Sequence, residues 1–208
     1  MKDKEKSSKQ IVNFTLLITI ASLLFIIVIL LLGSGKSGVI SSDNEASGSV
    51  GAADRWVGQK APDFELEDFE GNKVSLASLK GKVVVLFFTE GLMCYPACWD
   101  QMAKLGSDPR FNNENVVSYS VIVDSQSDWK KAFDKMPELR STKVLFDTYR
   151  TASRSYDALN VASSMHRGSY PGHTYFLMDR EGVIRYFFDD PSMGIRNDLV
   201  FEQLEKIL

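Results

Sequence analysis

The fold is decided by residues 82–88, KVVVLFF, and by the ten residues that follow them, TEGLMCYPAC at 89–98. The first stretch is a nearly continuous β-branched and aromatic run, which is typical of a central strand buried on both faces. A helix is expected over residues 96–105, because Pro96 suits a first helical turn, where its missing N–H costs nothing. Both cysteines of the chain, Cys94 and Cys98, therefore lie where a buried strand passes into a helix.

Alternating strand-like and helix-like segments surround this junction. The turn-rich stretch at 68–72 joins two short strands into an N-terminal hairpin, and residues 179–182 join the last two strands. The order predicts an α/β fold with a mixed central sheet and helices on its faces. The other strands are expected at 64–66, 73–76, 116–123, 143–146, 174–178 and 183–188, and the other helices at 127–136, 148–159 and 197–208.

Length and charge limit the function classes. A chain of 208 residues leaves room for one ordinary domain once any membrane segment is subtracted. We place this domain at residues 56–208, which carry 18 basic and 22 acidic side chains and no basic stripe. Nucleic acid is therefore not expected as a partner.

The N-terminal part predicts a single-pass membrane anchor. Residues 11–32 are uncharged and largely apolar, and roughly 20 such residues cover the ~30 Å hydrocarbon core, whereas a cleavable signal has an apolar region of about 7–15 residues. Four lysines precede this segment, at positions 2, 4, 6 and 9, so residues 1–10 are expected in the cytoplasm. Residues 33–55, rich in Gly and Ser, predict a flexible linker to an extracytoplasmic domain.

The two cysteines read as a working site, since one closely spaced pair cannot be the disulfide framework of a small secreted fold. At a helix N-terminus, unpaired N–H groups and the macrodipole lower a thiol pKa below about 8.5, which favours Cys94 as the nucleophile. Cys98 follows four residues later, and on a helix this spacing gives a Cα separation of roughly 6 Å, suitable for a disulfide. Two buried cysteines that pack as small apolar side chains are the alternative.

Two longer stretches carry a resemblance to a known family. Residues 58–88, GQKAPDFELEDFEGNKVSLASLKGKVVVLFF, resemble the opening of the redoxin branch of the thioredoxin-like superfamily, which includes peroxiredoxins and membrane-tethered thiol-disulfide oxidoreductases. Residues 173–187, HTYFLMDREGVIRYF, are similar to the final hairpin of that family. The resemblance covers residues 58–208 and implies a thioredoxin-like fold, Cys94 as the reactive thiol, no cofactor, and protein thiols or disulfides or a small peroxide as substrate.

The cysteine motif departs from the family in ways that favour thiol-disulfide exchange over peroxide reduction. Three residues separate the cysteines, where thioredoxins have two, and Met93 stands where a Trp is usual. Peroxiredoxins carry a Thr three residues before the reactive Cys, and Gly91 occupies that position here. Thr89 could substitute from two residues earlier, and we therefore count it among the substrate-binding residues.

The resemblance also assigns roles near the last hairpin. Aligned on Asp179, His173 takes the place of the thioredoxin cis-proline and of a peroxiredoxin arginine that faces the thiol. His173 is therefore expected to face Cys94, as the imidazolium of an ion pair or as a hydrogen-bond donor. A buried histidine bonded to backbone is the alternative. Pro171 is expected to supply the cis bond and to contact substrate.

A second family resemblance leads to a different function. A Cys-x-x-x-Cys pair with a distant histidine, behind one membrane anchor, also resembles the Sco family of copper-delivery proteins. Cys94, Cys98 and His173 would then be copper ligands, since two thiolates and an imidazole suit Cu(I) or Cu(II). The enzyme interpretation is preferred because only the cysteine spacing matches this second family near the motif.

Overall fold

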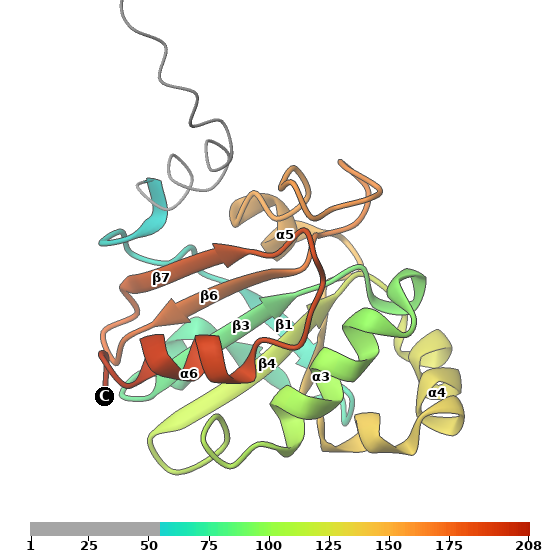
Figure 1. Ribbon diagram of the computed structural model, residues 1–208, viewed down its shortest axis with the longest axis horizontal. Coiled ribbons are helices and arrows are strands. Elements are labelled where there is room, and N and C mark those ends of the chain that lie inside the picture. The colour runs from blue at the N-terminus through green and yellow to red at the C-terminus, as the bar shows by residue number, and fades with distance from the viewer. Residues whose placement is uncertain (1–54) are drawn as a thin grey trace, which may run out of the picture. The chain divides into compact units, whose positions relative to one another are not determined.

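Seven strands form one mixed sheet in the computed structural model, which describes residues 55–208 (Figure 1). Their order across the sheet is β2-β1-β5-β4-β3-β6-β7. β3 runs parallel to β4 and β4 parallel to β5, whereas β6 lies antiparallel to β3, so the predicted mixed sheet is confirmed. The strands are β1 Glu65–Asp68, β2 Lys73–Ser75, β3 Val83–Phe88, β4 Val116–Ile122, β5 Val144–Phe146, β6 Thr174–Met178 and β7 Ile184–Asp189.

The predicted membrane segments lie outside the described residues. This applies to the N-terminus at 1–10, the anchor at 11–32 and the linker at 33–55, of which only Arg55 is described. Within residues 55–208, no helix combines the length and the apolar sequence needed to cross a bilayer.

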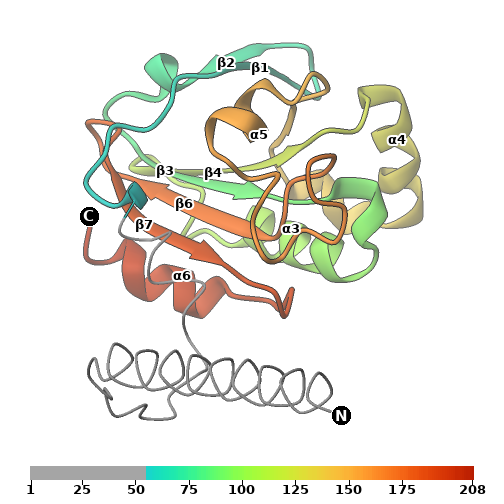
Figure 2. The ribbon, with the colours of Figure 1, turned by 90° about the horizontal axis from the view of Figure 1, so that it is seen from above.

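Both faces of the sheet are covered, as the apolar run of β3 predicts. Every residue of β3 is buried, and successive side chains point to opposite faces. Val83, Val85 and Phe87 pack with α3 (Ala97–Ser107), α4 (Gln126–Lys135) and α6 (Asn197–Leu204). Val84, Leu86 and Phe88 pack on the other face, with α5 (Thr151–Ser155) and Tyr156. Figure 2 shows α5 and α6 on opposite sides of the sheet.

Two helices are shorter than the sequence predicts. The helix expected over 148–159 is reduced to α5, because Arg150 and Asp157, on either side of it, adopt left-handed backbone conformations with φ of 58° and 51°. The last helix ends at Leu204 and not at Leu208. Three short 3-10 helices were not predicted: η1 Leu76–Leu79, η2 Gly91–Cys94 and η3 Pro137–Ser141.

The strand register gathers three chain segments at one end of the sheet. Phe88, at the end of β3, lies opposite Val121 of β4 and opposite Thr174, the first residue of β6. The residues that follow β3, those that follow β4 and those that precede β6 therefore meet there. The cysteine motif, Asp124 and His173 belong to these three segments.

Candidate active site

Cys94 and Cys98 are joined by a disulfide, with an S–S distance of 2.00 Å and a Cα–Cα distance of 5.3 Å. The predicted pairing is thus present, but the two residues do not share one helix. Cys94 ends the 3-10 helix η2, and Cys98 lies in the first turn of α3, which begins at Ala97. Cys94 is 4% exposed and Cys98 is fully buried. An attacking sulfur therefore has more access to Cys94.

Two side chains fix the backbone of η2. Oδ2 of Asp124, just beyond the end of β4, accepts a hydrogen bond from Leu92 N at 3.0 Å. Trp99 of α3 donates its indole N–H to the carbonyl oxygen of Gly91 at 3.0 Å. Gly91 has a φ of 60°, and a Cβ added to it would lie 1.8 Å from Asp124 Oδ2, so only glycine fits this position. Burial raises the pKa of the Asp124 carboxyl above its usual value.

His173 contacts Cys98, whereas the sequence predicts that it faces Cys94. Its Nδ1 lies 3.6 Å from Cys98 Sγ, and its Nε2 lies 2.9 Å from the Tyr175 hydroxyl oxygen. The reason is the register: His173 precedes β6 on the sheet face that α3 covers, where its ring packs on Phe87 at 4.6 Å between centroids. Burial lowers the pKa of His173 to about 4. The imidazole is therefore neutral at pH 7 beside the disulfide.

Met193 covers the other sulfur of the disulfide. Its Sδ lies 3.7 Å from Cys94 Sγ. Met193 follows β7 in a loop that is organised by the buried carboxylate of Asp190, which accepts hydrogen bonds from Ser192 N, Gly194 N and the Arg196 guanidinium. No sequence signal marked Met193, because the residue lies far from the cysteines in the chain.

A buried carboxylate links the cysteine turn to the loop before β6. Glu90 is fully buried and directly precedes η2. Its Oε1 accepts hydrogen bonds from Met165 N at 2.6 Å and His166 N at 3.1 Å, and its Oε2 lies 3.1 Å from His166 Nδ1. Sequence reasoning gave His166 no specific role and did not select Glu90. An acidic residue two positions after an apolar strand was the available signal.

Residues 57–187 match the model of the AhpC/TSA family. The chain belongs to this family. Peroxiredoxin Bcp of Bacillus subtilis (strain 168) is 31% identical over 131 residues, covering 61% of this chain and 80% of that protein. The thiol-disulfide oxidoreductase ResA of Bacillus cereus (strain ATCC 10987 / NRS 248) is 28% identical over 187 residues, covering 89% of this chain and 94% of that protein.

The fold is also found in solved structures. The crystal structure of peroxidoxin BcpB from Mycobacterium tuberculosis matches with a TM-score of 0.61 at 20% sequence identity, covering 74% of this chain and 98% of that one. The predicted thioredoxin-like α/β fold is therefore confirmed for the described residues. Membership of the AhpC/TSA family, with peroxiredoxins and thiol-disulfide oxidoreductases as relatives, identifies the protein as a thiol-dependent oxidoreductase.

Two residues of this AhpC/TSA protein, Thr89 and Pro171, were expected to bind substrate. Thr89 is fully buried, and its hydroxyl oxygen accepts a hydrogen bond from Gly91 N at 3.4 Å. Pro171 does not supply a cis bond: within residues 55–208 only the Tyr95–Pro96 bond is cis. The trans form is the more stable form of most X–Pro bonds by about 0.5–1 kcal/mol. Contact of either residue with substrate stays a prediction.

The copper hypothesis is not supported by a metal-binding arrangement in the part of the chain that the structure describes. No group of three or more His, Cys, Asp or Glu side chains there is placed to hold a metal ion. Both sulfurs of the predicted copper set are engaged in the disulfide. Copper binding by the reduced pair and His173 stays a prediction.

Proposed function

We propose that the protein is a membrane-anchored thiol-disulfide oxidoreductase whose domain acts on the extracytoplasmic side of the cell membrane. The observation that carries the redox part is the disulfide at the end of β3, with Cys94 slightly exposed and Cys98 fully buried. This asymmetry separates the two roles that such a pair needs. Cys94 exchanges with the client, and Cys98 resolves the mixed disulfide.

The chemistry is an exchange of two electrons between dithiol and disulfide pairs. In the reduced domain, the Cys94 thiolate attacks a client disulfide, forms a mixed disulfide and releases one client thiolate. The Cys98 thiolate then attacks Cys94 Sγ, which closes the domain disulfide and releases the second client thiolate. The same steps in reverse oxidise a client dithiol. No resident cofactor is expected, because the cysteines themselves carry both electrons.

His173 is the group placed to assist Cys98. When a client thiolate attacks the disulfide at Cys94, Cys98 leaves as a thiolate and needs a hydrogen-bond donor. The neutral imidazole provides one in the tautomer with a proton on Nδ1, in which Nε2 accepts from the Tyr175 hydroxyl. A hydrogen bond to a charged sulfur stabilises that leaving group.

Peroxide reduction is the second candidate, supported by the similarity to peroxiredoxin Bcp. The motif favours exchange, because Gly91 stands at the position of the peroxiredoxin threonine. The Thr89 hydroxyl, two residues earlier, is buried and bonded to the backbone of Gly91.

The enzymatic test uses the full chain in detergent, reduced and freed of excess reductant. We expect it to reduce oxidised glutathione and a disulfide-bonded peptide with loss of two protein thiols, and to consume hydrogen peroxide slowly. The Cys94→Ser variant should be inactive with all three probes. Peroxide consumption that is faster than exchange with both disulfides would favour the second candidate.

Membrane anchoring rests on the uncharged apolar segment at residues 11–32 and on the four lysines that precede it. Protease added to intact spheroplasts that express the full chain should remove the domain while cytoplasmic markers survive. Protection of the domain until the membrane is lysed would contradict the proposed orientation.

A further inference from the structure

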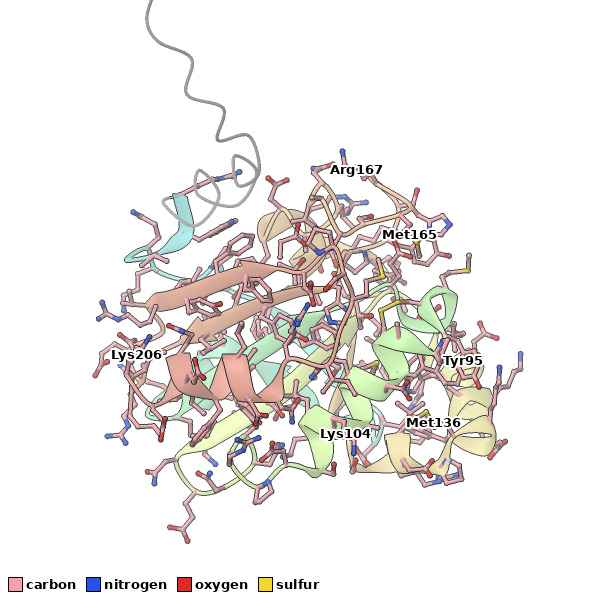
Figure 3. The ribbon with its side chains drawn as sticks, in the orientation of Figure 1. Tyr95, Lys104, Met136, Met165, Arg167 and Lys206 are labelled. Carbon is pink, nitrogen blue, oxygen red and sulfur yellow. A yellow bond between two sulfur atoms is a disulfide. The ribbon has the colours of Figure 1, made fainter. Side chains whose placement is uncertain are left out.

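The sulfur of Met193 lies against the disulfide, and the backbone that carries it has an unusual conformation. Its Sδ is 3.7 Å from Cys94 Sγ, so the two sulfurs are in van der Waals contact. Met193 has a φ of 49°, a left-handed conformation that is uncommon for residues other than glycine and that persists only where the surroundings hold it. Figure 3 shows the disulfide as a yellow bond, on the side of the molecule where Met165 is labelled.

Asp190 holds this conformation. One oxygen of its carboxylate accepts hydrogen bonds from the backbone N–H and the hydroxyl of Ser192, and the other accepts from Gly194 N at 3.0 Å and Arg196 Nε at 2.7 Å. Met193 N donates to the carbonyl oxygen of Asp190 at 3.0 Å. Both chain neighbours of Met193 are therefore bound to one buried carboxylate, and a fixed loop presents the thioether to the disulfide.

While the disulfide is closed, the thioether is the sulfur at this site that an oxidant attacks. A disulfide offers no thiolate to a peroxide, whereas a methionine thioether is converted to a sulfoxide. Met193 is partly exposed, so an oxidant in solution reaches it. Oxidation puts a polar, chiral group in the place of an apolar one, directly beside Cys94.

The disulfide and the thioether together have the arrangement of the products of sulfoxide reduction by a dithiol. That reaction leaves a thioether, a disulfide and water. In the structure, the Met193 thioether touches the sulfur of Cys94, and Cys98 is bonded to that same sulfur. In the reduced domain, a sulfoxide on Met193 is therefore a substrate already held at its nucleophile. Well-oriented groups within one molecule react at effective concentrations of about 10⁵–10⁸ M.

We propose that Met193 is an oxidation site and that the two cysteines reduce its sulfoxide. A hydroperoxide or a hypohalous acid oxidises the thioether. After the disulfide has been reduced, the Cys94 thiolate attacks Met193 Sδ, an Sγ–Sδ bond forms, and the sulfoxide oxygen leaves as water with the two thiol protons. The Cys98 thiolate then attacks Cys94 Sγ, which closes the disulfide and restores the thioether. The dithiol supplies both electrons. This activity goes beyond the proposed exchange, because it needs no client.

The test starts from the full chain in detergent with its disulfide closed. Hydrogen peroxide oxidises the methionines and is removed, and a phosphine then opens the disulfide and keeps the cysteines reduced. Peptide mass spectrometry should show that the sulfoxide at Met193 is lost at least about tenfold faster than the one at Met165, which is the internal control because it is 62% exposed. About half or more of the Met193 sulfoxide should disappear, since oxidation gives two epimers and a fixed geometry suits at least one.

Two controls assign the reduction to the cysteines. The Met193 sulfoxide should persist in Cys94→Ser under the same treatment, and in the wild type when the phosphine is left out. The inference is overturned by a Met193 sulfoxide that survives in the reduced wild type, by equal loss at Met165 or in Cys94→Ser, or by a Met193 that stays unoxidised while Met165 is oxidised. Exchange of the unoxidised protein with oxidised glutathione is measured in parallel, and failure of that exchange would contradict the proposed function instead.

Discussion

Nδ1 of His173 lies 3.6 Å from Sγ of Cys98, while the Tyr175 hydroxyl holds the opposite ring nitrogen at 2.9 Å. All three residues are fully buried. In the proposed exchange, the imidazole therefore acts on Cys98, the resolving sulfur, and not on Cys94, which meets the client. In thiol-disulfide exchange, an imidazole beside Cys98 controls how well the Cys98 thiolate leaves the disulfide and how readily it attacks the mixed disulfide at Cys94.

Replacing His173 should weaken the Cys98 thiolate. We expect His173→Gln to raise the pKa of the Cys98 thiol and to slow exchange by about tenfold or more, because a hydrogen bond to a charged group contributes about 1.5–3 kcal/mol. Ultraviolet absorbance of the thiolate, followed against pH in a Cys94→Ser background, measures that pKa. Tyr175→Phe should shift it in the same direction by less. A Cys98 pKa that is identical with and without the imidazole would remove His173 from the site.

Single cysteine variants should separate the two roles. Cys98→Ser should accumulate mixed disulfides with glutathione or a client through Cys94, because no thiol remains to release them. Cys94→Ser should accumulate few, since Cys98 is fully buried. Mass spectrometry of the full chain under non-reducing conditions counts the adducts. Stronger trapping by Cys94→Ser would reverse the assignment.

The close approach of Gly91 to Asp124 predicts a large effect of one methyl group. Gly91→Ala should cost about 3 kcal/mol or more of unfolding free energy, because the left-handed conformation disfavours alanine and the Cβ meets Asp124 Oδ2. Gly71→Ala is the matched control: its φ is 83°, and nothing lies within 4 Å of the added Cβ. Its cost should be about 1 kcal/mol. Urea denaturation of the full chain in detergent compares the two.

A double variant tests the cause of that loss. If the clash is responsible, Gly91→Ala combined with Asp124→Ala should cost clearly less than the two single changes added together. Additive costs would show that the left-handed backbone, and not the carboxylate, excludes the methyl group.

Burial of His173 should make folding sensitive to pH. The unfolded histidine takes up a proton at its usual pKa of 6.5, whereas the folded one does so only at about 4. The unfolded state therefore binds more protons between these values, and the unfolding free energy decreases as pH falls from 6.5 towards 4, by about 3 kcal/mol in total. The loss between about pH 7 and about pH 4.5 should be smaller in His173→Gln. A loss of equal size in both proteins would contradict the assignment.

Copper affinity distinguishes a redox enzyme from a copper carrier. We expect the reduced protein to bind copper weakly, with and without the His173 side chain, because the imidazole serves the resolving thiol. Anaerobic titration of the wild type and of His173→Gln measures both affinities. Tight binding of one copper per domain that depends on His173 would support the copper-delivery alternative, since loss of one of three ligands sharply lowers affinity.

The strands were predictable from residue patterns, and the boundaries of several helices were not. The apolar run at 82–88 predicts a central strand because it has no polar face, and β3 occupies residues 83–88 of it. The helix expected over 148–159 forms only in part, for a local reason. Its polar and apolar residues suit a helix, but the left-handed conformations at Arg150 and Asp157 restrict it to Thr151–Ser155, and nothing in their residue types requires these conformations.

The site was predictable only where its residues are close in the chain. Cys94 and Cys98 lie four residues apart, and their disulfide was expected from that spacing. Met193 and Asp124 reach the same turn from other segments, so only the sheet register brings them there. The register also fixes the contact of His173: alignment placed the residue near the cysteines, and the sheet face on which it lies brings it to Cys98.

The first residues that the structure describes join the sheet at the end opposite the disulfide. Gly58 N donates to Ile184 O and Ala61 N to Gly182 O, beside the start of β3, whereas the disulfide follows the end of that strand. Figures 1 and 2 both draw these residues away from the start of α3. Six strand residues span about 20 Å. A solid support or a dye coupled ahead of Arg55 would therefore leave the disulfide facing solution, so an immobilised form of the domain should keep its exchange rate.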